Sequence, residues 1–213
     1  MAFSILSSKL YFPDPALADK EGLVAIGGDL STKRLLLAYS MGIFPWYSAN
    51  EPICWWSPDP RFVLLPEELK VSSSMRNVIN SGRFKFTVNR AFSQVILNCK
   101  NRLRHGKPGS WINNEIIASY TELHALGYAH SAEAWTAGKL VGGLYGVRLG
   151  KLFFGESMFS NESNASKFAF INYVDLLKQE GVILIDCQMY TAHLESLGAK
   201  MIAREEFLQQ LKG

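Results

Sequence analysis

The chain has 213 residues, of which 48% are hydrophobic and 19% are charged, and its formal net charge is +3. This composition is typical of a folded globular protein and excludes a disordered or fibrous chain. The first 15 residues lack a sustained apolar run, and no later run approaches the length of a membrane span, so we expect a cytoplasmic protein without a membrane segment. Three cysteines without CxxC spacing and four histidines without ligand spacing predict a reducing compartment and no metal site.

The first part of the chain is predicted to form a small unit. Ser31 is suited to cap a helix over residues 32–41, and Gly42 is suited to end it. Residues 61–65 are expected to form a short apolar strand, after which a proline and two glutamates interrupt the pattern. We therefore divide the chain into a small N-terminal domain, residues 1–66, and a second domain, residues 67–213.

Residues 44–61 hold three of the five tryptophans and four of the eight prolines. Because the prolines remove backbone donors, we expect an ordered loop held by turns rather than by strand pairing. Two interpretations of Trp46, Trp55 and Trp56 remain open. The rings stack on a flat ligand, or they fill the contact between two layers of the fold.

A basic block spans residues 69–114, which contain nine lysines and arginines and no acidic residue, whereas the rest of the chain has 13 basic and 19 acidic residues. Such a run is often only a solvated face. Together with the aromatic segment, it favours binding of a polyanion, with a base stacked on tryptophan. The nine residues are Lys70, Arg76, Arg83, Lys85, Arg90, Lys100, Arg102, Arg104 and Lys107.

The second domain has a more diagnostic order of elements. Turn signals at residues 137–138 and 149–150 imply that three successive strands form an antiparallel meander. The next helix is expected to be capped by Ser163 and ended by Gly181. The predicted elements are a strand at 84–88, helices at 91–100 and 115–125, strands at 128–136, 139–148 and 151–158, a helix at 164–180, a strand at 182–188, a short helix at 192–197, and a final strand and helix.

This order resembles the N-acetyltransferase (GNAT-like) acyltransferase fold, an α+β fold with a mixed, mainly antiparallel sheet. In that fold the fourth and fifth strands splay apart and form a reactive cleft. Here the corresponding strands carry Glu156 in one and Asp186 and Gln188 in the other. Asp186 and Gln188 are two residues apart, so we expect them on one face of their strand. A second interpretation is that Asp186 caps a helix or pairs with a cation.

Ordinary acetyltransferase activity is not supported by the residues that follow Glu156. Such enzymes hold the pyrophosphate of acetyl-coenzyme A with a glycine-containing loop at a helix start. No glycine lies between Gly155 and Gly181 in this chain. We therefore expect the fold without this cofactor, and we expect no other cofactor.

Several motifs together resemble those of the leucyl/phenylalanyl-tRNA–protein transferase family, and they cover nearly the whole chain. The resemblance implies transfer of Leu, Phe or Met from aminoacyl-tRNA to proteins with N-terminal Arg or Lys, which marks them for N-end rule degradation, by a monomeric enzyme. The motifs are GGDLS at 27–31, GIFPWYS at 42–48, WWSPDPR at 55–61, SW at 110–111, LVGGLYGV at 140–147, FFGESMFS at 153–160, NASK at 164–167 and IDCQ at 185–188.

The resemblance also implies roles for individual residues. Trp46 and Trp111 would flank the 3′-terminal adenine of the tRNA, with Tyr39, Tyr120 and Gly155 nearby. The tRNA backbone would be held by Arg76, Arg83 and Lys85. The apolar side chain of the donor would enter a pocket formed by Leu144, Phe153, Met158, Phe170, Tyr173, Leu177 and Ile185.

The implied reaction is aminolysis of an ester, with Asp186, Gln188 and Glu156 as the catalytic residues. In one mechanism Asp186 orients Gln188, whose carbonyl accepts a hydrogen bond from the attacking amine. In another, Asp186 and Glu156 bind the cationic acceptor and positioning supplies the acceleration. A covalent intermediate on Ser157, Ser160 or Cys187 is less favoured, since none has a convincing histidine partner. The alternative from another class is an RNA-binding module without catalysis, which leaves the catalytic residues unexplained.

Overall fold

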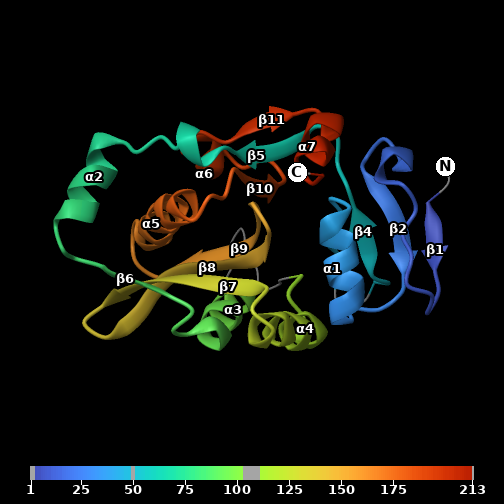
Figure 1. Cartoon of the computed structure of the whole chain (residues 1–213). Coiled ribbons are helices and arrows are strands. Elements are labelled where there is room, and N and C mark those ends of the chain that lie inside the picture. Colours follow the sequence, from blue (N-terminus) through green and yellow to red (C-terminus); the bar gives the residue numbers. More distant parts are fainter. Residues whose placement is uncertain (1–2, 49–50, 103–110, 213) are drawn as a thin grey trace.

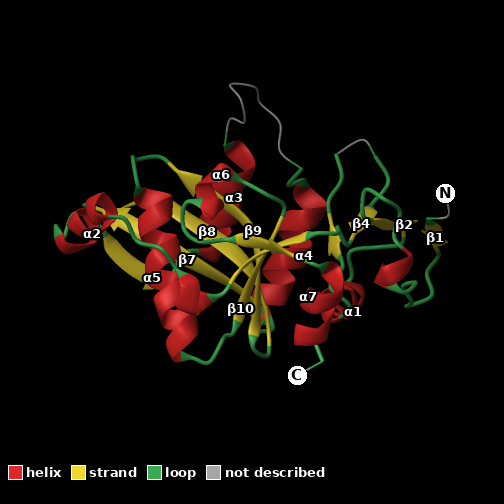
Figure 2. Ribbon diagram, turned by 90° about the horizontal axis from the view of Figure 1, so that it is seen from above, coloured by secondary structure: helices red, strands yellow, loops and turns green. Residues whose placement is uncertain are grey.

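The computed structural model describes residues 3–48, 51–102 and 111–212 (Figure 1). The N-terminal part forms a four-stranded sheet in the order β1-β2-β4-β3, and helix α1 contacts both β3 of this sheet and helix α4 of the larger part. Figures 1 and 2 both show the small sheet at one end of the molecule rather than on a face of the larger sheet. The elements are β1 (Ser4–Leu6), η1 (Pro15–Leu17), β2 (Leu23–Gly27), α1 (Thr32–Ser40), β3 (Phe44–Pro45) and β4 (Cys54–Trp56).

Helix α1 begins and ends as the sequence predicts. The Ser31 side chain accepts a hydrogen bond from the backbone N–H of Arg34, and Gly42 follows the helix with a φ of 72°, in the left-handed region that glycine adopts at little cost. The prediction for the aromatic segment was wrong in part. Strand β4 pairs with both β2 and β3, so a ladder holds Trp55 and Trp56 in place. Because β3 is an edge strand, the missing N–H of its proline leaves this ladder intact.

The larger sheet has seven strands in the order β11-β5-β10-β9-β8-β7-β6. Strands β7, β8 and β9 form the predicted antiparallel meander, and β9 pairs in parallel with β10. The sheet is therefore mixed and mainly antiparallel, as expected for the fold class. Its strands are β5 (Arg61–Leu64), β6 (Lys85–Val88), β7 (Ala129–Thr136), β8 (Lys139–Leu149), β9 (Leu152–Ser160), β10 (Leu184–Gln188) and β11 (Lys200–Ile202).

Helices cover both faces of this sheet. In Figure 1, α5 lies above β8 while α3 and α4 lie below it, in agreement with their contacts. The predicted cap of α5 was wrong, because Asn164, with a φ of 70°, occupies the cap position instead of Ser163. The helical elements are η2 (Pro66–Glu68), α2 (Ser73–Asn80), which was not predicted, α3 (Phe92–Asn101), α4 (Asn114–Ala125), α5 (Ala165–Gln179), α6 (Ala192–Glu195) and α7 (Arg204–Gln210). Of the helices in the described ranges, none combines the length and apolarity needed to cross a bilayer.

Strand β5 changes the predicted division of the chain. A boundary after residue 66 would place β5 in the N-terminal domain, yet β5 pairs with both β10 and β11 in the large sheet. By sheet membership the division therefore lies just before Arg61. The two parts also share one hydrophobic cluster, which joins residues such as Tyr39 and Trp55 to Tyr120 and Phe154.

Strands β9 and β10 diverge after a short parallel pairing. Their register ends with Asp186 opposite Phe154, and β9 then continues along β8 to Ser160. Beyond this point β10 pairs only with β5, and its register shifts between Asp186 and Gln188. The divergence is the splay that the fold class predicts, and it opens a cleft between the two strands.

A buried ion pair lies beside the splay. Nε and Nη2 of Arg61 donate hydrogen bonds to Oδ1 and Oδ2 of Asp186 at 2.8 and 2.7 Å, and both side chains are fully buried. The guanidinium carbon of Arg61 lies 4.8 Å from the ring centre of Phe44 and 4.5 Å from that of Phe207. Of the interpretations left open for Asp186, the structure therefore shows the pairing with a cation.

The expectation that Asp186 and Gln188 share a strand face was wrong. The register shift and the positive φ of Gln188, 62°, break the alternation of side chains. Asp186 instead accepts a hydrogen bond from the backbone N–H of Gln188 at 2.9 Å. Asp186 thus fixes the backbone of Gln188 while its own carboxylate points away from the cleft and toward Arg61.

Asp186→Asn should lower the free energy of unfolding by about 3–5 kcal/mol, because it leaves the buried Arg61 charge without its counterion. Urea denaturation of the purified variant measures this loss. The matched control is Asp175→Asn, since Asp175 is exposed and lies outside such a pair; it should change stability by less than about 0.5 kcal/mol. Equal stabilities of the two variants would contradict the structural role of the pair.

Candidate active site

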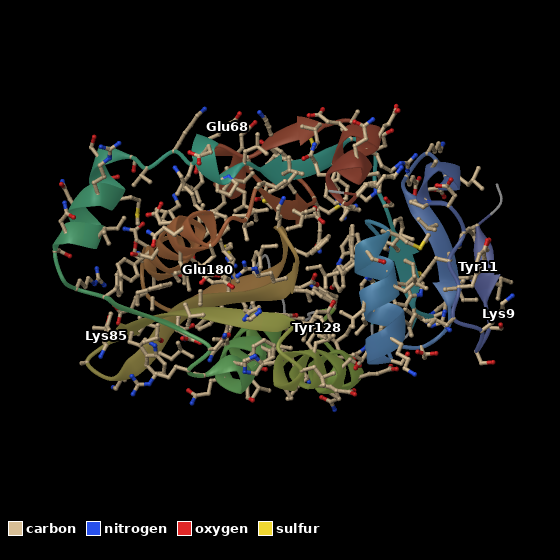
Figure 3. The ribbon with its side chains drawn as sticks, in the orientation of Figure 1. Lys9, Tyr11, Glu68, Lys85, Tyr128 and Glu180 are labelled. Carbon is tan, nitrogen blue, oxygen red and sulfur yellow. The ribbon has the colours of Figure 1, made fainter. Side chains whose placement is uncertain are left out.

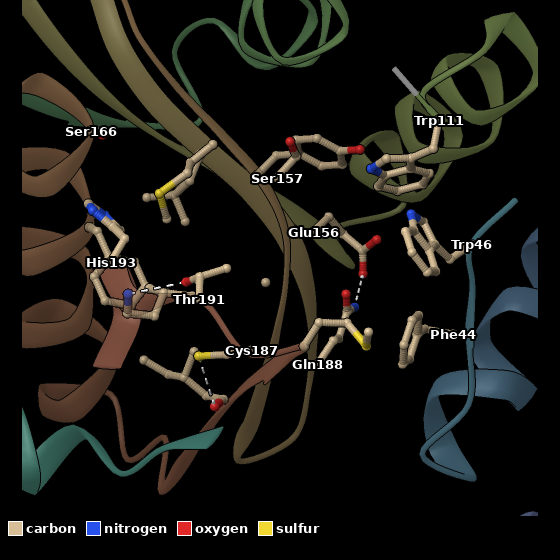
Figure 4. A pocket seen from close by; sticks show the side chains of 18 of the residues that line it. Phe44, Trp46, Trp111, Glu156, Ser157, Ser166, Cys187, Gln188, Thr191 and His193 are labelled. Carbon is tan, nitrogen blue, oxygen red and sulfur yellow. Dashed lines mark hydrogen bonds between the residues drawn. The ribbon is translucent and has the colours of Figure 1, made fainter. Parts of the chain in front are cut away.

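A cavity of about 520 Å³ opens where β9 and β10 diverge (Figure 4). The N-terminal part contributes Phe44 and Trp46 to the wall of this cavity. Trp111, just before α4, also lines it, and the diverging strands contribute Glu156 and Gln188. Figure 4 shows these five side chains gathered at one end, with Ser166, Thr191 and His193 at the other. The cavity is therefore built by segments far apart in the sequence.

Glu156 is the centre of a hydrogen-bond cluster at the aromatic end. Its Oε1 accepts hydrogen bonds from the hydroxyl of Tyr39 at 2.7 Å and from Nε2 of Gln188 at 3.0 Å. Its Oε2 accepts one from the hydroxyl of Tyr120 at 3.1 Å, and the two tyrosine hydroxyls are also hydrogen-bonded to each other. Burial raises the pKa of both tyrosines well above the usual range, so both remain protonated and able to donate.

Burial raises the pKa of Glu156 to about 7. The hydrogen bonds from Tyr39, Tyr120 and Gln188 lower this pKa, and the nearby charge of Asp186 raises it further. Glu156 therefore exchanges its proton near neutral pH, as a general base requires. Among the described residues that line the cavity, it is the only acidic one.

The hydrogen bond from Gln188 to Glu156 fixes the orientation of the Gln188 amide. A carboxylate only accepts hydrogen bonds, so the amide nitrogen of Gln188 must face Glu156. The carbonyl oxygen of the amide then remains as an acceptor at the cavity wall. This is the geometry required of a group that orients an attacking amine.

The tryptophans of the aromatic segment have different environments. Trp46 lines the cavity with 42% of its surface exposed, and the edge of Trp56 supports it while the Trp56 ring N–H donates to the Trp46 carbonyl at 2.7 Å. Trp55 is fully buried, donates to the Gly27 carbonyl and packs on Phe12. The packing interpretation is thus confirmed for Trp55, whereas stacking of Trp46 on a flat ligand stays a prediction.

Only part of the predicted donor pocket lines the cavity. Leu144, Met158, Phe170 and Ile185 line the cavity. Phe153, Tyr173 and Leu177 do not line it; they are buried in the core between α5 and the sheet, where Phe153 and Tyr173 meet edge to face. Gly155 lines the cavity, whereas Tyr39 and Tyr120 are fully buried behind Glu156 and contact that carboxylate instead of the open space.

The structure does not favour a covalent intermediate. Cys187 and Ser157 line the cavity, but burial raises the pKa of the Cys187 thiol well above its usual range, which suppresses the reactive thiolate. Ser160 is outside the cavity lining and donates to the backbone carbonyl of Glu162. Asp186 is closed off by Arg61 and is not available to bind a cationic acceptor, contrary to that part of the second mechanism.

Sequence reasoning missed several residues that line the cavity. Arg102 belongs to the basic block but was not singled out, and Nη1 of this residue donates to the Met158 carbonyl at 3.1 Å. Thr191, His193 and Leu194 follow β10 directly in the short helix α6 and its cap. Their place in the sequence, directly after a strand expected to splay, could have identified them, because the segment that follows a splayed strand closes the end of the cleft.

The predicted tRNA-backbone residues lie away from the cavity. Arg83 and Lys85 line a separate hollow of about 380 Å³, and Arg76 lies on α2 with its Nε directed to the Val71 carbonyl. In Figure 3, Lys85 lies at the end of the molecule opposite to Lys9 and Tyr11 of the N-terminal part. Arg104 and Lys107 of the basic block are outside the described residues.

Within the part of the chain that the structure describes, no group of three His, Cys, Asp or Glu side chains is placed to hold a metal ion.

Family models match both parts of the chain. The family model described as leucyl/phenylalanyl-tRNA protein transferase matches residues 63–212, and the model of its N-terminal domain matches residues 28–59. Among solved structures, a GCN5-related glucosamine N-acetyltransferase region of a fungal β-N-acetylglucosaminidase is similar with a TM-score of 0.47 and 12% identity, over 84% of this chain and 23% of that one.

Two relatives carry the name leucyl/phenylalanyl-tRNA–protein transferase. The protein from Flavobacterium johnsoniae is 55% identical over 207 residues, which cover 97% of this chain and 98% of the relative. The protein from Syntrophobacter fumaroxidans is 53% identical over 206 residues, which cover 97% of this chain and 88% of the relative. The chain therefore belongs to the leucyl/phenylalanyl-tRNA–protein transferase family.

Proposed function

We propose that this protein transfers leucine or phenylalanine from aminoacyl-tRNA to the N-terminus of an acceptor protein, with the reaction in the cavity between β9 and β10. The observation that carries the proposal is the pair of Glu156 and Gln188, hydrogen-bonded at 3.0 Å between an aromatic wall and an apolar chamber. An aminoacyl-adenosine needs these three surroundings in this order, for its base, its carbonyl group and its side chain.

The donor occupies the cavity from end to end in this proposal. The terminal adenine stacks against Trp46 and Trp111, and stacking contributes about 1–3 kcal/mol per base. The side chain of Leu, Phe or Met enters the chamber, where its burial contributes about 1.5–3 kcal/mol. The chamber is lined by Leu144, Met158, Phe170 and Ile185.

The acceptor amine attacks the ester carbonyl carbon, and the ribose 3′-oxygen leaves. The Gln188 carbonyl accepts a hydrogen bond from the amine and orients its lone pair. Ionised Glu156 takes the proton that the amine loses as the peptide bond forms and passes it to the ribose 3′-oxygen, which leaves as a hydroxyl while Glu156 returns to its ionised form. Asp186 is a positioning residue, because it touches only Arg61 and the backbone of Gln188.

The charge of the cavity also bears on the acceptor. Glu156 places an acidic group where the amine arrives, which favours acceptors that begin with a cationic residue, Arg or Lys. The side chains assigned to the donor and to the chemistry all come from one chain, and we propose that the enzyme acts as a monomer. We place the reaction in the cytoplasm, where it would mark acceptors for N-end rule degradation.

Transfer of labelled leucine and phenylalanine tests the proposal. Purified protein is mixed with labelled Leu-tRNA or Phe-tRNA and with one of three matched acceptors that begin with Arg, Lys or Ala, and label is counted in acid-precipitated protein after base hydrolysis of the remaining ester. We expect label on the Arg and Lys acceptors only. Binding of tRNA without any transfer would instead support the RNA-binding alternative.

The pH dependence of transfer should report Glu156. Its raised pKa, about 7, means that the ionised form is lost as the pH falls through 7, so transfer should fall in the same window. The acceptor amine, with a reference pKa of about 7.7–8.0, is protonated over the same range. The logarithm of kcat/KM should therefore rise with pH with a slope near 2 below both values in the wild type, but near 1 in Glu156→Gln. Equal slopes would show that Glu156 does not accept the proton.

A further inference from the structure

The two tryptophans that line the aromatic end of the cavity come from different segments of the chain. Trp46 follows β3 in the N-terminal part, whereas Trp111 comes just before α4 in the larger part. Figure 4 shows the two side chains next to each other. We call the space between them the adenine slot. Its width depends on how the N-terminal part is held against the start of α4.

A side-chain hydrogen bond joins these two segments beside the tryptophans. Nδ2 of Asn113 donates to the hydroxyl oxygen of Tyr47 at 3.0 Å. Tyr47 is the residue after Trp46, and Asn113 is the second residue after Trp111. The bond is partly buried and Tyr47 is 7% exposed, so water competes with it only in part. The bond therefore ties the backbone of one tryptophan to that of the other through short lengths of chain.

The amide of Asn113 is oriented by its second role, the cap of α4. Its Oδ1 accepts a hydrogen bond from the backbone N–H of Ile116 at 2.9 Å, as is usual for a cap residue. The amide nitrogen then faces the other way and is available as a donor. One side chain thus holds both the first turn of α4 and the N-terminal part.

The surroundings of each tryptophan couple its ring to this bond. The Trp46 N–H donates to the Cys54 carbonyl at 2.9 Å, and the Trp46 carbonyl accepts from the Trp56 ring N–H at 2.7 Å. Ile112, the next residue after Trp111, is 1% exposed and lies in the hydrophobic cluster that the two parts share. A shift of either segment therefore moves its tryptophan.

A second hydrogen bond between the two parts lies further along α4. The hydroxyls of Tyr39, on α1, and Tyr120, on α4, are hydrogen-bonded to each other. Tyr120 is about two helical turns beyond Asn113. A single tie would let α4 pivot about it, whereas two ties also fix the orientation of the helix. The bond between Tyr47 and Asn113 is the tie that lies nearer to the tryptophans along the chain.

We propose that the hydrogen bond between Tyr47 and Asn113 sets the width of the adenine slot, so that both are positioning residues for the donor. The inference rests on the proposed function, because that function places the terminal adenine between Trp46 and Trp111. Neither Tyr47 nor Asn113 lines the cavity, so both act through the tryptophans. A base contacts both rings only where the gap matches its thickness, and a wider slot loses one of the two contacts.

The experiment compares intact deacylated tRNA with the same tRNA lacking its 3′-terminal adenosine, and measures the binding of each to the full chain by filter retention. The ratio of the two affinities reports the adenine slot, because the other contacts are common to both forms. Tyr47→Phe removes the acceptor of the hydrogen bond. Asn113→Ser removes the donor but keeps an oxygen for the cap of α4. Each variant should lower the ratio about threefold to tenfold, and the double variant should lower it no further.

Two control variants separate the hydrogen bond from general effects. Asn113→Ala loses the cap as well as the donor, so it should be less stable in thermal unfolding than Asn113→Ser but should lower the ratio equally. Tyr128→Phe removes a phenol hydroxyl just beyond the other end of α4 and should keep the wild-type ratio (Figure 3). Thermal unfolding also confirms that all compared proteins are folded.

Three results would overturn the inference. The first is a wild-type ratio in both Tyr47→Phe and Asn113→Ser. The second is a lowered ratio in Asn113→Ala alone, since the helix cap would then be responsible. The third is a double variant whose loss is the product of the two single losses, because the two residues would then act independently.

Steady-state transfer gives a second readout and separates this inference from the proposed function. In the single variants KM for leucyl-tRNA should rise about threefold to tenfold while kcat changes less than about twofold, because only binding of the base is weakened. A wild type that transfers leucine while the variants match it overturns the slot width alone. A wild type that binds intact tRNA more tightly than truncated tRNA but transfers nothing overturns the proposed function, and the ratios still decide the inference. Equal binding of the two tRNA forms by the wild type overturns the inference, and transfer then decides the function.

Discussion

The buried ion pair of Arg61 and Asp186 is the constraint on which the site depends. It joins β5 to β10, and the Arg61 guanidinium lies between a ring of the N-terminal part, Phe44, and a ring of α7, Phe207. Asp186 also holds the backbone N–H of Gln188, at the residue where β10 leaves regular strand geometry. A buried pair adds little net stability over an apolar replacement. The pair matters here for position, because it holds four separate segments around the open end of the splay: β5, β10, the N-terminal part and α7.

The two carboxylates beside the splay have different roles because they have different partners. Asp186 faces a cation, whereas the donors to Glu156 are neutral, namely two phenols and an amide. Neutral donors only partly offset the cost of burying a charge, so the pKa of Glu156 rises to about 7. The same feature that leaves Glu156 without a counterion makes it able to exchange a proton at neutral pH. Asp186 is therefore a structural residue, whereas Glu156 is the candidate for proton transfer.

Local patterns in the sequence predicted the order of elements from β6 onward, the meander and the polar residues on the two splayed strands, because these follow from periodicity and turn residues. Three features depend on long-range contacts and were beyond such patterns. Arg61 and Asp186 pair across 125 positions. Trp46 lines the open cavity, whereas Trp55 packs against Phe12, and this difference depends on distant parts of the chain. The side-chain alternation of β10 fails at Gln188 because a neighbouring strand shifts register there, which the run of apolar residues before it does not signal.

The basic block shows how a charge pattern along the chain becomes two surfaces in space. Arg102 lines the cavity, while Arg83, Lys85 and Arg90 line a separate hollow, and the acidic partner of Arg83, Glu162, comes from outside the block. Glu156 stands at the other, aromatic end of the cavity. The charge run along the chain therefore does not predict which of its members reach the cavity, because that depends on which segments the fold brings to the splayed strands.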